Sequence, residues 1–133
     1  MYRTGEVHGR ITERAEEVRR LVGYSDSAKV TENLWGERWS KLVANVMGNG
    51  LSACTGLPGA EIVKSEPLRR FATRLGSEAI RVGQALGYSL EEILHLPPET
   101  IARAGEGDAA AIEVADAQRL KDTGRVSGEQ RPS

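Results

Sequence analysis

The stretch NLWGERWSKLVANVMGNG, residues 33–50, decides the fold because it has the spacing of a long packed helix. Asn33 is a good N-cap. The glycines at positions 48 and 50 predict that the helix ends there. The apolar residues recur at helical intervals and define the face that we expect to be buried: Trp35, Trp39, Leu42, Val43, Val46 and Met47.

A polar line borders this apolar face when residues are placed at about 100° intervals: Lys41, Asn45 and Asn49. Small residues fill the remaining sector and favour close contact with another element: Ser40, Ala44 and Gly48. Charged and amide side chains on a helix usually form a solvated edge. However, two asparagines four residues apart lower helix propensity without a packing gain. A lysine on a semi-buried face can act as a proton donor, since desolvation lowers the pKa of an amine. From spacing alone, both interpretations stay open.

The residues before this helix have the pattern of a strand, a helix and a second strand. Residues 2–11 suit a short strand pair or an extended edge, and residues 27–31 suit a strand. Thr12 can cap a helix that runs to about Val22. Such short strands bury too little surface to be stable alone, so we expect them to form the edge of something larger.

The residues after position 50 predict further helices, following a connection rich in Gly and Pro at 51–60. Ser65 can cap a long helix that ends at Gly87, and Asp108 can cap another over residues 109–121. Ser89 and Glu92 have the spacing of a capping box, which predicts a short helix before a turn or two at 99–104. The long helix has the clearest amphipathic stripe: Leu68, Phe71, Ala72, Leu75, Ala79, Val82 and Leu86. The fold class is therefore mainly α.

The composition is that of one globular domain, with 133 residues, 39% hydrophobic and 28% charged. The 18 basic and 19 acidic residues nearly cancel, which provides no case for binding nucleic acid or a membrane surface. We expect a cytoplasmic protein because no signal peptide or membrane-spanning run is present. Cys54, the single cysteine, is expected to be buried. His8 and His95 lack partners at metal-ligand spacing, so we expect no metal site.

The pattern W-x-K-L-x-x-N-x-x-x-N, residues 39–49, resembles the start of the C-terminal domain of ketopantoate reductases. GE-x-x-G-R-I-T at 5–12 resembles the last strand region of that family's nucleotide-binding domain, and VGQALGY at 82–88 resembles the next helix. The resemblance implies that residues 1–32 are a strand–helix–strand remnant of a Rossmann domain. Residues 33–133 would then be a helical substrate domain of the 6-phosphogluconate-dehydrogenase-like type, truncated at its C-terminus.

The resemblance also implies a reaction and the residues that perform it. Ketopantoate reductases use NADPH to reduce a 2-keto acid such as 2-dehydropantoate to the 2-hydroxy acid, on the route to pantothenate and coenzyme A. Lys41 would be the general acid, and Asn45 and Asn49 would bind the substrate. Ser133 resembles a further substrate-binding serine of the family. Exposed apolar helices would also allow a homodimer.

Two departures from the family pattern limit these expectations. The chain contains no G-x-G-x-x-G fingerprint for a dinucleotide, and the family's substrate-binding Glu has no counterpart after Ser133. We therefore expect an internal fragment that, alone, neither binds NADPH tightly nor reduces a keto acid. The alternative is a non-catalytic helical interaction domain or an inactive gene remnant.

Overall fold

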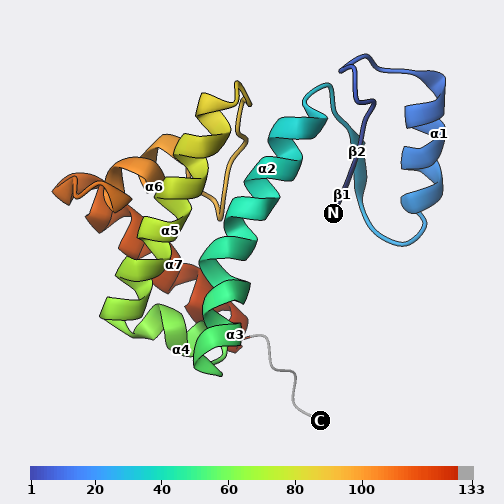
Figure 1. Cartoon of the computed structure of the whole chain (residues 1–133). Coiled ribbons are helices and arrows are strands. Elements are labelled where there is room, and N and C mark those ends of the chain that lie inside the picture. The colour runs from blue at the N-terminus through green and yellow to red at the C-terminus, as the bar shows by residue number, and fades with distance from the viewer. Residues whose placement is uncertain (129–133) are drawn as a thin grey trace, which may run out of the picture.

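The computed structural model describes residues 1–128 of the 133-residue chain. They form a small β–α–β unit, at the right of Figure 1, and a larger body of helices joined to it at the start of α2. The strands are β1 (Tyr2–Thr4) and β2 (Ala28–Val30). The helices are α1 (Glu13–Val22), α2 (Leu34–Asn45), the π-helix η1 (Val46–Gly50), α3 (Leu51–Thr55), α4 (Gly59–Lys64), α5 (Glu66–Ala85), α6 (Pro98–Gly105) and α7 (Ala109–Gly128). The described fold is mainly α with two short N-terminal strands, as the sequence predicted.

The β–α–β unit pairs its two strands in parallel, with Tyr2 opposite Ala28 and Thr4 opposite Val30. Parallel strands need a crossover connection, and α1 supplies it. The Thr12 side chain caps α1 as predicted, accepting a hydrogen bond from the Ala15 amide at 3.2 Å. The alternative of a strand pair within residues 2–11 is wrong, because β1 finds its partner 26 residues further along the chain, beyond α1.

The loop between β1 and α1 is held by a buried carboxylate, that of Glu6. It accepts hydrogen bonds from Thr12 Oγ1 at 2.6 Å and from Arg14 Nε and Nη2 at 3.0 and 2.6 Å. These hydrogen bonds, the one from Arg14 above all, lower the pKa of the Glu6 carboxyl from 4.5 to about 2, although burial acts in the opposite direction. The ionised carboxylate therefore fastens the loop to the first turn of α1.

We expect acid to loosen this unit. Because the pKa of Glu6 is about 2 in the folded state, below its value in an unfolded chain, ionisation stabilises the fold above about pH 5. This contribution is lost as the pH falls from about 5 to about 2. NMR amide signals of residues 4–15 should report the loss in the natural chain. Glu6→Gln should weaken the unit at pH 7 and flatten the pH dependence, whereas Glu17→Gln, at an exposed position of α1, should change neither. Identical acid profiles for Glu6→Gln and the natural chain would contradict this role.

The helix that begins at Leu34 continues beyond the point where the sequence predicted its end. Gly50 keeps a right-handed helical backbone, with φ −60° and ψ −46°, and the chain passes through η1 into α3. The helix stops at Gly56, whose φ of 71° is the left-handed conformation that glycine adopts without strain. The predicted end near Gly48–Gly50 is therefore wrong, since the chain accommodates these glycines by widening one turn into a π-helix.

Relative to the face predicted from the sequence, the buried face of α2 is rotated toward the small residues of the helix. Trp35 and Leu42, predicted to be buried, are 45% and 46% exposed. Ser40 is buried, and its hydroxyl donates to the Gly36 carbonyl at 2.8 Å and accepts from the Glu91 amide at 2.8 Å. The predicted close contact at the small residues is thus present at Ser40, because the segment that follows α5 lies against this part of α2. It is absent at Gly48, where an added Cβ atom would meet no described atom within 4 Å.

Helix α5 runs nearly as predicted, although the Ser65 side chain makes no capping hydrogen bond. Its packing also favours small residues, because neighbouring helices approach closely. A Cβ atom on Gly76 would lie 2.5 Å from Met47 Sδ, and one on Gly83 would lie 2.2 Å from Trp39 Nε1. Phe71, at 53% exposed, instead lies on the outer side of the helix with two further residues of the predicted stripe: Val82 and Leu86.

Residues 89–96 contain a tight turn at 93–96 rather than the predicted capped helix. Ile93 and Leu96 exchange two backbone hydrogen bonds, of 2.9 and 3.0 Å. Leu94 and His95 between them have φ of 51° and 61°, as in a type I′ turn. The capping box does not form because backbone groups of this segment bond to α2 and its N-cap instead. The Asn33 Nδ2 group, for example, donates to the Ser89 carbonyl at 2.7 Å.

The remaining helices close the core. Asp108 caps α7 as predicted, since its carboxylate accepts from the Ala111 amide at 2.9 Å. Helix α6 packs between α5 and α7. Cys54 is exposed, contrary to the prediction, because Leu51 supplies the buried side of the short α3. Within residues 1–128 no helix combines the length and apolar character needed to cross a membrane.

Candidate functional site

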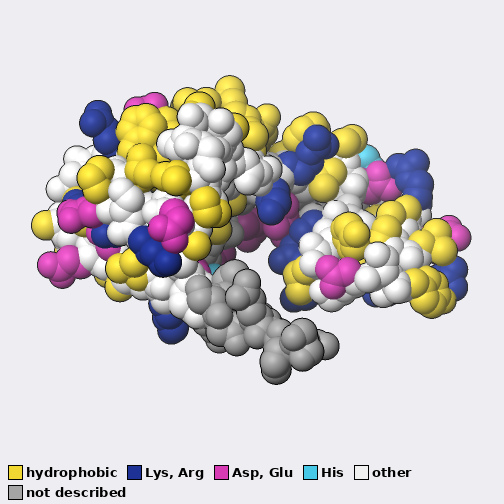
Figure 2. Space-filling model, turned by 90° about the horizontal axis from the view of Figure 1, so that it is seen from below, with side chains coloured by type: hydrophobic (Ala, Val, Ile, Leu, Met, Phe, Trp, Pro, Cys, Tyr) yellow, Lys and Arg dark blue, Asp and Glu magenta, His cyan; other side chains and the backbone are white. Residues whose placement is uncertain are grey.

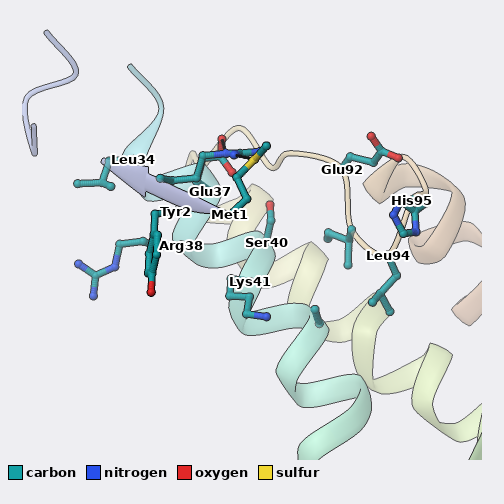
Figure 3. Close-up of a pocket in the computed structure, with 13 residues that line it drawn as sticks. Met1, Tyr2, Leu34, Glu37, Arg38, Ser40, Lys41, Glu92, Leu94 and His95 are labelled. Atoms are coloured by element: carbon teal, nitrogen blue, oxygen red, sulfur yellow. Dashed lines mark hydrogen bonds and ion pairs between the residues drawn. The ribbon is translucent and has the colours of Figure 1, made fainter. Parts of the chain in front are cut away.

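Lys41 lines a groove in which the β–α–β unit, α2 and the 93–96 turn meet (Figure 3). The groove has a volume of about 620 Å³. In Figure 3, the Lys41 ammonium lies on the side of α2 that faces Leu94. Residues from all three elements contribute to the walls, among them Tyr2, Arg3, Glu37, Ala44, Glu92 and His95. The groove therefore joins segments separated by up to about 90 positions of sequence.

The Lys41 ammonium makes no hydrogen bond or ion pair with any residue of the described part of the chain. Two other polar side chains of the groove have partners: Arg3 Nε donates to Glu37 Oε1 at 2.8 Å, and His95 Nδ1 lies 3.3 Å from an oxygen of Asp122. Lys41 is exposed rather than semi-buried, because the described residues leave the groove open. Its positive charge is therefore available to a bound anion or to an oxygen that gains negative charge.

Asn45 and Asn49 continue the polar line toward the C-terminal end of the same helix, and both are exposed. Asn49 Nδ2 lies 3.5 Å from Asn45 Oδ1, at the limit of hydrogen bonding. Neither residue lines the Lys41 groove. The structure therefore brings the two carboxamides together, with Lys41 one turn before them. Ser133, the fourth predicted site residue, lies outside the described residues.

The groove contains residues that the sequence pattern did not single out for this site, chiefly Tyr2 and Arg3 of β1 and Glu92 of the turn. The contact between His95 and Asp122 spans 27 positions, so no spacing rule could predict it. Among the described residues, no group of three His, Cys, Asp or Glu is placed to hold a metal ion.

The N-terminus of α1 is not free to bind a phosphate group. In a Rossmann domain the pyrophosphate binds at the N-terminus of the first helix, where backbone amides attract negative charge. At the N-terminus of α1 this position already holds the carboxylate of Glu6, with Thr12 and Arg14 as its donors. A pyrophosphate there would face a fixed negative charge.

Comparison with known proteins decides the family. The sequence-family model described as ketopantoate reductase PanE/ApbA C terminal matches residues 33–121 of the chain. The chain belongs to the ketopantoate reductase family. Within this ketopantoate reductase domain, the match runs from the N-cap of α2 into α7, so it includes Lys41, Asn45 and Asn49.

One curated relative supports the same family. A 2-dehydropantoate 2-reductase from Mesorhizobium japonicum is 37% identical over 84 residues, which are 63% of this chain and 25% of that protein. The chain thus spans about a quarter of the length of this ketopantoate reductase relative. No solved structure gives a significant match to the chain.

Proposed function

We propose that the chain is the substrate-domain part of an NADPH-dependent reductase that converts a 2-keto acid, such as 2-dehydropantoate, to the 2-hydroxy acid. One observation carries the proposal: Lys41 lies in an open groove, on the helix covered by the family match, and has no ionic partner within residues 1–128. The cofactor would be held by a dinucleotide-binding domain, which the described residues do not contain.

Lys41 is proposed to act as the general acid. When hydride reaches the keto carbon, the carbon–oxygen double bond becomes a single bond and the oxygen gains negative charge. The Lys41 ammonium would stabilise that charge and donate a proton to the oxygen, and water would then reprotonate the amine. A lysine without an internal ion pair suits this role, because an existing partner would have to be displaced first.

Asn45 and Asn49 are proposed to orient the substrate. Each carboxamide has two N–H donors and one acceptor oxygen, which suit the carboxylate and hydroxyl groups of a small hydroxy acid. Four residues of helix span about 6 Å, which is comparable to the length of such an acid. The proximity of Asn45 to Asn49 would let both contact one end of the substrate while Lys41 contacts the reacting oxygen.

Kinetics need a complete enzyme, and a chimera supplies one. Residues 33–121 would replace the matching stretch of the Mesorhizobium japonicum 2-dehydropantoate 2-reductase. In this chimera, Asn45→Ala should raise KM about tenfold and lower kcat less, because it removes binding shared by substrate and transition state. Gln84→Ala removes an exposed carboxamide from α5, outside the polar line, and should leave both constants unchanged. A fall in kcat at constant KM for Asn45→Ala would contradict an orienting role.

A second candidate, a helical interaction domain, is favoured by one observation. Figure 2 shows hydrophobic side chains in contiguous groups on the larger lobe. Exposed hydrophobic residues include two of α2, two of α5 and the C-cap residue of α5: Trp35, Leu42, Phe71, Val82 and Leu86. Exposed apolar surface of this kind is typical of an interface, including one between two copies of the chain. A folded chimera without reductase activity, together with a concentration-dependent dimer of the chain, would favour this candidate.

A further inference from the structure

Helix α7 carries a buried arginine whose side chain has no hydrogen-bond or ion-pair partner among the described residues. Arg119 is only 9% exposed, and its Nη1 atom is buried without a hydrogen bond. Within the described residues, no carboxylate or carbonyl lies in contact with its guanidinium. Arg69, the other buried arginine, pairs with Asp116 at 2.9 Å and donates to the Val63 carbonyl at 2.7 Å. Because an unpaired buried charge is costly, the missing partner of Arg119 requires an explanation.

A cavity of about 270 Å³ lies beside Arg119. Its walls come from α7, from the Leu94 turn, and from small apolar residues of α2, η1 and α4: Ala44, Gly48, Ala60 and Val63. Ala44 and Leu94 also line the Lys41 groove, so the two spaces adjoin. The cavity therefore combines the cationic Arg119, the acidic Asp122 and the hydroxyl of Thr123 with a mostly apolar surface.

The nearby carboxylates do not neutralise Arg119 at contact distance. Asp116 is held by Arg69, and Asp122, which also lines the cavity, accepts from Gln118 Nε2 at 2.9 Å and contacts His95. Burial lowers the pKa of the Arg119 guanidinium, and the charge of Arg69 acts in the same direction, whereas the two carboxylates oppose it. An arginine nevertheless stays protonated at neutral pH. The guanidinium is therefore a buried cation beside an apolar cavity.

We propose that this cavity binds a short-chain aliphatic carboxylate. The carboxylate would accept hydrogen bonds from the Arg119 guanidinium, whose planar donors match its geometry. The alkyl group would pack against the small apolar residues of α4 and η1. Inorganic anions fit the site less well, because they have no alkyl group to pack against these apolar residues. This site goes beyond the proposed reductase function, since it does not use Lys41.

Titration of the 133-residue chain with isobutyrate tests the site, with calorimetry and amide NMR shifts as readouts. We expect saturable binding that shifts the signals of α4 and α7. Arg119→Met should weaken binding at least about tenfold, because it removes the charged donors. The same variant should not lower Tm, because it also removes an unpaired buried charge. Arg74→Met, at an exposed arginine of α5, is the matched control and should bind isobutyrate as the natural chain does.

Two further variants separate the site from its neighbours. Ala60→Leu should fill the cavity and abolish binding while Arg119 remains in place. Lys41→Met should leave isobutyrate binding unchanged, which distinguishes this cavity from the adjoining groove. The proposal is overturned by an absence of saturation up to about 50 mM in a folded chain, by unchanged affinity in Arg119→Met, or by loss of binding in Lys41→Met.

Discussion

Replacing Lys41 with alanine should lower the kcat of the chimera by about 10² to 10⁴-fold, the range found when a general acid is removed. The substituted side chain would leave the developing alkoxide without a proton donor and without a counter-charge. KM should change much less, because Asn45 and Asn49 would still bind the substrate. The structural basis is the position of Lys41 in the groove, where no described residue neutralises its charge. Steady-state rates of NADPH oxidation measure the effect.

Two controls make the Lys41 result specific. Lys121→Ala removes an exposed lysine from α7, away from the groove, and should leave kcat unchanged. A small primary amine added to the Lys41→Ala enzyme should restore part of the rate, because it can supply the missing proton, whereas a merely structural lysine would not be rescued. Unchanged turnover in Lys41→Ala would contradict the catalytic role and would indicate that Lys41 only belongs to the solvated edge of the helix.

Replacing Ile80 with alanine should lower the free energy of unfolding by about 2–5 kcal/mol. Ile80 is fully buried in the middle of α5, within the apolar cluster that includes Met47 and Ile101. Removal of the larger side chain would lose buried area and leave a cavity that the close-packed helices cannot fill. For a domain of this size, such a loss should lower Tm by roughly 10 °C or more.

Val82→Ala on the same helix is the matched control. Val82 is 52% exposed, so its truncation should change the free energy of unfolding by less than about 0.5 kcal/mol. Urea unfolding of both variants, followed by circular dichroism, measures the difference. Equal destabilisation of the two variants would contradict the orientation of α5, and with it the position of the core.

Features of the fold that depend on local chemistry could be predicted from the sequence. Thr12 and Asp108 cap their helices through neighbouring amides, so the signal is short-range. Features that depend on residues distant in the sequence could not be predicted in this way. The Ser89–Glu92 capping pattern is overridden by Asn33, the N-cap of α2, and by Ser40, which bind the Ser89 carbonyl and the Glu91 amide of the same segment.

Burial was the least predictable property of the helices. Hydrophobicity placed Trp35 and Phe71 in the core, but both are about half exposed. Helices that cross closely need small residues at the contact, and Gly76 and Gly83 provide them on α5. Hydrophobic periodicity locates a helix well, but it does not reveal which side meets a close neighbour.

The candidate site shows the same division between local and distant information. The line of Lys41, Asn45 and Asn49 was visible because all three residues belong to one helix. The opposite walls of the groove come from β1 and from the turn at 93–96, which only the folded chain brings near α2. No sequence pattern indicated that Arg119 is buried, since its burial results from the packing of α7.

The most direct test of the proposed reductase function is the rate of NADPH oxidation with 2-dehydropantoate, measured for the 133-residue chain alone and for the chimera. Lys41, the proposed proton donor, lies in an open groove, and the proposal assigns NADPH to a dinucleotide-binding domain outside the described residues. We therefore expect turnover by the chimera and none by the chain alone. Turnover by the chain alone, or a folded chimera that does not oxidise NADPH, would contradict the proposal.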